Sequence, residues 1–145
     1  MPSLDKSDVI KNLLTNLITI SGRKTDRGHA IITLDNVMKE LENKYDFLKY
    51  VEIKDTRYIE DIDTIKVMPD INDVNPSEMG KALYDIITTM DSSLGENAGH
   101  FFIKELNNRL DDDNRTIIND MGVDLSIMQL EREVRDLEKT ISKKQ

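Results

Sequence analysis

The hydrophobic positions near the start of the chain repeat with the period of an α-helix. They recur in pairs four residues apart and form one broad face: Val9, Ile10, Leu13, Leu14, Leu17 and Ile18. This spacing predicts a core helix. We expect it to end at Ser21-Gly22, because glycine often closes a helix in the left-handed conformation, with a polar basic loop following as far as Gly28. A second helix is predicted to begin near Thr33 as its cap and to bury Leu34, Val37, Met38, Leu41 and Tyr45.

Between Phe47 and Met68 the period changes from helical to two. Apolar and polar residues alternate over residues 51–54 and again over 64–67, with the apolar positions Val51, Ile53, Ile65 and Val67. The alternation predicts two short strands that pair as an antiparallel ribbon. We expect the acidic residues between them, Glu60, Asp61 and Asp63, to lie in a solvated loop, with weak cation binding as the alternative.

The strongest helix start in the chain follows the ribbon. Asn75 can act as the cap, Pro76 occupies the first helical position, and Glu78 can reach back to the cap. The predicted helix buries Met79, Ala82, Leu83, Ile86, Ile87 and Met90 and is broken by residues 92–95.

Three further helices are predicted after that break. One carries Ala98, Phe102, Ile103, Leu106 and Leu110, and a short one, capped within 111–114, carries Ile117, Ile118 and Met121. Gly122 ends the short helix and Asp124 can cap the last one. The fold class is therefore α+β and mainly helical, with about six helices and one small two-stranded antiparallel ribbon between helices 2 and 3. We expect a domain over 1–122 and a coiled-coil-like amphipathic helix over 123–145.

The last predicted helix carries a narrow apolar stripe, which we call the seam. Its members are spaced 3, 4, 3 and 4 residues apart: Ile127, Leu130, Val134, Leu137 and Ile141. Such a stripe is narrower than the face of a core helix and suits docking against one other helix. β-branched residues at one heptad position and leucine at the other favour a parallel two-stranded coiled coil, but Glu133 would then face Glu138 of the second copy. Packing on its own domain, a homodimer and binding to another protein all remain open.

The amino-acid composition limits the kinds of chemistry and of binding partner that are expected. The formal net charge is −8, there are no cysteines and there are two histidines. Absence of cysteine excludes disulfides and thiolate chemistry and fits a cytoplasmic protein. The acidic charge makes nucleic-acid binding unlikely. No apolar run approaches the roughly 18 residues that a membrane span needs, so no membrane association is expected.

One basic cluster stands out in this acidic chain. Arg23, Lys24, Arg27 and His29 lie within seven residues in the predicted first loop. The cluster is a candidate site for a phosphate or carboxylate, particularly beside the positive end of a helix. The simpler interpretation is a solvated loop that offsets nearby acids.

Other candidate sites are weaker. Glu96 and His100 are four residues apart and would lie on one side of the fourth helix, as a metal or acid-base pair, although a satisfied histidine at the edge of the core is the simpler interpretation. A calcium loop beginning at Asp111 would place Thr116 and Gly122 at the obligatory glycine and glutamate positions. We therefore expect no metal, no cofactor and no catalytic centre.

These observations favour a non-catalytic protein-interaction or regulatory adaptor module that acts through helical association, either as a homodimer or with a protein partner. One alternative is a winged-helix-like DNA-binding regulator, because two helices precede a ribbon, although Asp35, Glu40 and Glu42 make the second helix a poor reader of DNA. Another is a small domain that binds an anion or nucleotide through the basic cluster.

Overall fold

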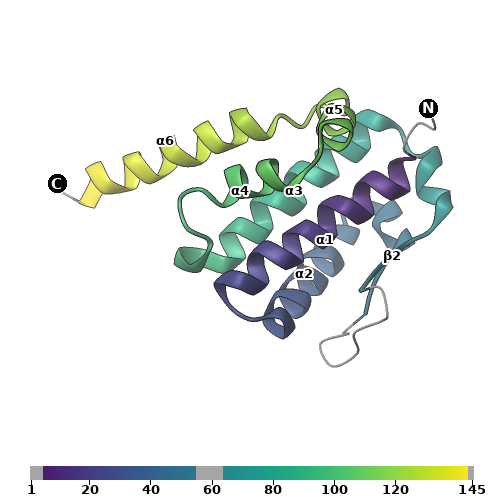
Figure 1. Ribbon diagram of the computed structural model, residues 1–145, viewed down its shortest axis with the longest axis horizontal. Coiled ribbons are helices and arrows are strands. Elements are labelled where there is room, and N and C mark those ends of the chain that lie inside the picture. The colour runs from purple at the N-terminus through teal and green to yellow at the C-terminus, as the bar shows by residue number, and fades with distance from the viewer. Residues whose placement is uncertain (1–4, 55–63, 144–145) are drawn as a thin grey trace.

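The computed structural model describes residues 5–54 and 64–143, and this part of the chain has the predicted mainly helical α+β fold (Figure 1). Two helices, α1 (Lys6–Lys24) and α2 (Arg27–Glu42), precede a two-stranded antiparallel sheet, β1 (Val51–Ile53) and β2 (Ile65–Val67). Four helices follow: α3 (Pro76–Leu94), α4 (Phe102–Arg109), α5 (Asp112–Asp120) and α6 (Leu125–Lys143). Short 3-10 helices occupy Asp46–Tyr50, Pro69–Asp73 and Gly95–Ala98.

The core is organised around α1. This helix contacts α2, α4, α5 and β2, and α2 in turn contacts α3. The predicted apolar face of α1 is buried throughout, and burial continues to Ile20 and Ser21. Figure 1 shows α1, α2 and α3 side by side in the body of the protein, while α6 crosses one edge and carries the C-terminus away from it.

The predicted boundary between the first two helices is wrong. α1 continues through Gly22 to Lys24, and α2 begins at Arg27 rather than near Thr33. Asp26 is the cap of α2, because its side chain accepts a hydrogen bond of 2.8 Å from the backbone N–H of His29. Gly22 lies inside α1 instead of ending it, and a Cβ at this position would make ordinary contact, 3.4 Å from Cα of Arg27.

The ribbon is confirmed in position and direction. Val51 pairs with Val67, Glu52 with Lys66 and Ile53 with Ile65. Opposite charges on Glu52 and Lys66 therefore face each other across the two strands, which favours this register. The predicted acidic loop with Glu60, Asp61 and Asp63 lies outside the described residues.

Local capping signals predicted the later helices well. The Asn75 side chain accepts from the backbone N–H of Ser77 at 2.8 Å, and Pro76 is the first residue of α3. Glu78, which was predicted to reach back to the cap, accepts a hydrogen bond from Lys81. The predicted break at 92–95 begins too early, because α3 continues to Leu94.

The caps of the last two helices are also confirmed. Asp111 accepts from the backbone N–H of Asn114 at 2.8 Å, and Asp124 accepts from that of Ile127 at 3.1 Å. Gly122, with φ of 100°, separates the two helices. The Asp111 segment is a capping turn, as the failed calcium pattern indicated.

Candidate functional site

The seam on α6 faces solvent. All of its side chains are more than half exposed: Ile127 54%, Leu130 60%, Val134 54%, Leu137 60% and Ile141 51%. A surface helix of a globular protein normally turns its apolar stripe toward the core. The first turn of α6 follows this rule, because Leu125 and Met128 are buried. Beyond that turn the arrangement is inverted, and the apolar stripe faces solvent. The seam is therefore not part of the domain's own core.

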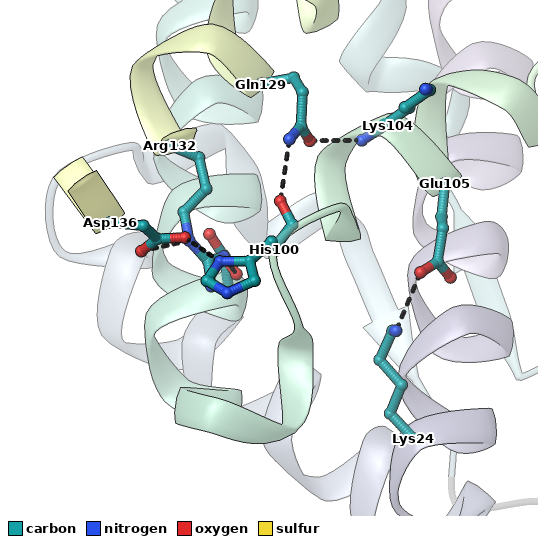
Figure 2. Close-up of polar contacts among 8 residues, drawn as sticks. Lys24, His100, Lys104, Glu105, Gln129, Arg132 and Asp136 are labelled. Atoms are coloured by element: carbon teal, nitrogen blue, oxygen red, sulfur yellow. Dashed lines mark hydrogen bonds and ion pairs between the residues drawn. The ribbon is translucent and has the colours of Figure 1, made fainter. Parts of the chain in front are cut away.

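The inner face of α6 is polar and is tied to α4. Gln129, which is buried, donates from Nε2 to the carbonyl of His100 at 2.8 Å and accepts at Oε1 from the backbone N–H of Lys104 at 2.9 Å (Figure 2). The residue that precedes α4, Phe101, provides no side-chain cap. Gln129 thus satisfies one of the free amides at the start of α4 from a different helix.

Arg132, one turn further along α6, lies between two carboxylates. Its guanidinium donates to Asp91 of α3 through Nη1 and to Asp136 through Nε, at 3.0 Å to Oδ2. The side chains are 13% exposed for Arg132 and 6% for Asp91. Burial opposes the charge on Arg132, but the hydrogen bonds to Asp91 and Asp136 outweigh it and raise the pKa of the guanidinium. Arg132 thus gives both Asp91 and Asp136 a cationic partner.

Asp136 extends this contact to the segment before α4. Its Oδ2 lies 2.6 Å from Nδ1 of His100, whose side chain is 72% exposed. The hydrogen bond from His100, followed by the one from Arg132, lowers the pKa of Asp136. We call the linked set Asp91, Gln129, Arg132, Asp136 and His100 the polar junction; it joins α3, α6 and the start of α4.

The predicted relation between Glu96 and His100 is wrong. Glu96 lies in the 3-10 helix Gly95–Ala98, and His100 follows Gly99, whose φ is 78°. The two residues are therefore not one turn apart on a continuous helix. His100 is also exposed rather than at the edge of the core, and its partner is Asp136.

A cleft of about 670 Å³ lies beside the polar junction, between α3 and α6. Its charged walls are mixed: the cations Arg132, Arg135 and Lys139 stand against the acids Asp91, Glu96 and Asp136. The carboxylate of Asp136 orients the imidazole of His100. Within the described residues, no hydrogen bond joins this imidazole to a serine or threonine hydroxyl, as a nucleophile and its base would require. Over residues 5–54 and 64–143 there is also no cluster of three or more histidine and carboxylate side chains suited to a metal. The arrangement fits a structural contact between helices.

The predicted basic cluster is not a loop. Arg23 and Lys24 end α1, whereas Arg27 and His29 lie in the first turn of α2. Lys24 forms an ion pair of 2.9 Å with Glu105 of α4 (Figure 2), and Arg27 donates to the Thr64 hydroxyl beside β2 at 2.8 Å. Two of these four side chains, Lys24 and Arg27, thus contact different elements of the domain instead of one common point.

One feature of the sequence points to the polar junction. Asp91 falls on the buried face of α3 beside Ile87, Met90 and Leu94, and a buried carboxylate requires a partner. Gln129, Arg132 and Asp136 recur at helical spacing on the side of α6 opposite the seam. A polar stripe opposite an apolar one does not by itself reveal which of the two faces the domain.

Comparison with protein-family models, with curated proteins and with solved structures finds no match in any of the three. No residue role is therefore transferred from a relative. None of the helices described for residues 5–54 and 64–143 is both long enough and apolar enough to cross a bilayer.

Proposed function

We propose that this chain is a non-catalytic interaction module that binds a helix of another chain through the seam on α6. The observation that carries the proposal is the orientation of α6: its polar inner face contacts α3 and α4, and its five seam residues are 51–60% exposed. Contiguous exposed apolar side chains on a soluble domain are typical of a binding surface.

The spacing of the seam residues indicates how a partner helix would pack against α6. Apolar residues at alternating spacings of three and four match the knobs that one helix inserts between the side chains of another. The seam spans two heptads, from Ile127 to Ile141, and coiled coils this short are marginal. We therefore expect reversible association, as suits an adaptor or regulatory protein, and the absence of cysteine supports a cytoplasmic setting for it.

The alternative functions receive no specific support. Glu40 and Glu42 are exposed on α2, where a DNA-reading helix needs cationic or neutral side chains. In the basic cluster, Lys24 and Arg27 already contact Glu105 and Thr64.

The test uses a designed three-heptad helical peptide with isoleucine at a, leucine at d and neutral glutamine at the flanking positions. We expect the wild-type protein to bind trace fluorescent peptide, measured by anisotropy, or to self-associate, measured by sedimentation. The double variant Val134→Asp, Leu137→Asp is expected to do neither while keeping its helical circular dichroism, because charged side chains do not pack in an apolar seam.

The matched control is Arg135→Gln, Lys139→Gln, which makes the same change of two charge units on exposed positions of α6 outside the seam. It should associate like the wild type. Absence of any association by the wild-type protein, or equal association by the seam variant, would contradict the proposed function.

A further inference from the structure

The charged residues that flank the seam are all acidic. With Ile127, Val134 and Ile141 at heptad position a and Leu130 and Leu137 at d, the flanking e positions are Glu131 and Glu138, and the g positions are Ser126, Glu133 and Thr140. Three cations of α6, Arg132, Arg135 and Lys139, lie away from the seam and line the cleft on the inner side. Three glutamates of α6 thus lie beside the seam, whereas Arg132, Arg135 and Lys139 lie on the cleft side together with Asp136.

These flanking acids are available to a partner. Glu131, Glu133 and Glu138 are exposed, and neither Glu133 nor Glu138 forms an ion pair within the described chain. The Glu131 carboxylate accepts a hydrogen bond of 3.3 Å from the Tyr84 hydroxyl, which leaves its negative charge in place. Within residues 5–54 and 64–143, none of these three glutamates forms an ion pair.

A second copy of the chain is a poor occupant of this surface. In a coiled coil the e and g residues of one helix face those of the other, in either relative direction. Every charged e or g residue here is a glutamate, so a copy presents acids to acids whether it runs parallel or antiparallel. The net charge of −8 adds repulsion between whole molecules.

We propose that the seam binds an amphipathic helix of a different protein, one with aliphatic residues at a and d and lysine or arginine at the flanking e and g positions. This inference rests on the proposed function and adds the chemistry of the partner. Apolar packing supplies the attraction, and the glutamate rows select for a basic-flanked helix and against self-association.

The test compares two peptides that share the a and d residues of the neutral peptide. One carries lysine and the other glutamate at all e and g positions, so that each repels its own copies. The wild-type protein should bind the lysine peptide at least about tenfold more tightly than the glutamate peptide. The preference should shrink as salt is raised, because exposed charges are screened.

A charge-reversed protein is the matched variant. Glu133→Lys, Glu138→Lys keeps every seam residue and leaves Glu131 with Tyr84, and we expect it to prefer the glutamate peptide. Equal binding of both peptides, or a seam-dependent homodimer of the wild type that excludes the lysine peptide, would overturn the inference while leaving the proposed function standing. Failure to bind all three peptides, together with no self-association, would instead contradict the proposed function itself.

Discussion

Arg132 holds α6 to the domain because its guanidinium lies between a carboxylate of α3 and a carboxylate of its own helix. Asp91 is 6% exposed, so it would be an uncompensated buried charge without this cation. At the scale of single residues, this contact decides which face of α6 points inward.

We expect Arg132→Met to lower the free energy of unfolding by about 3 kcal/mol, because it keeps much of the side-chain volume but leaves Asp91 unpaired. Arg135→Met is the control on the same helix; its side chain is exposed, and the change should be within about 0.5 kcal/mol. Urea unfolding followed by circular dichroism gives both values. Equal effects of the two substitutions would show that the ion pair does not stabilise the junction.

Asp136 provides a pH-dependent contribution. Hydrogen bonds from His100 and Arg132 lower its pKa in the folded protein. The stability that it contributes is therefore fully present above its unfolded pKa of about 3.9 and is lost as the pH falls through the lower folded pKa. Between about pH 5 and pH 2, the wild type should lose more stability than Asp136→Asn. Unfolding curves at a series of pH values measure this difference, and parallel pH profiles for the two proteins would contradict it.

At the scale of helices, Gly80 is required by close packing, whereas Gly22 is not. Gly80 lies within α3, and a Cβ there would lie 1.9 Å from the carbonyl oxygen of Met121, just before α6. Gly22 lies within α1, where the nearest atom to an added Cβ would be Cα of Arg27 at 3.4 Å. The first distance shows that the chain before α6 approaches α3 too closely for a side chain at position 80, whereas the second is an ordinary van der Waals contact.

Gly80→Ala should therefore destabilise the protein by about 2 kcal/mol, because backbone must move to admit the methyl group. Gly22→Ala, the comparison within another helix, should change the stability by less than about 1 kcal/mol, since its contact is mild and alanine favours a helix. Thermal unfolding compares them. A Gly80→Ala protein as stable as Gly22→Ala would show that α3 and the Met121 carbonyl are further apart than described.

The elements that sequence predicted well are those whose signals are local. Asn75, Asp111 and Asp124 cap helices because a side chain two or three residues away is enough to satisfy a free amide. The prediction that Gly22 ends the first helix is wrong because glycine is also tolerated inside a helix, at a modest cost relative to alanine. The seam itself was visible as a pattern, but its outward orientation was not, since that depends on Asp91, which lies in a distant helix.

At the scale of the whole molecule, the core of the domain does not include the seam residues. The core around α1 is closed by α2, α3, α4 and α5, and α6 attaches to it through Leu125, Met128 and the polar junction. Figure 1 shows the last turns of α6 extending from the edge of this body. Docking of a second helix on the seam therefore requires no rearrangement of the core.

The reactivity of a single cysteine tests this arrangement most directly, because the natural chain contains none. In Leu137→Cys the thiol should react with a small thiol reagent nearly as fast as in the unfolded protein, and the lysine-flanked peptide should slow the reaction. Met128→Cys, on the buried side of the same helix, should react slowly throughout. A Leu137→Cys thiol that is as protected as the one at position 128, in a monomeric protein without peptide, would contradict the account, because the seam would then belong to the domain's own core.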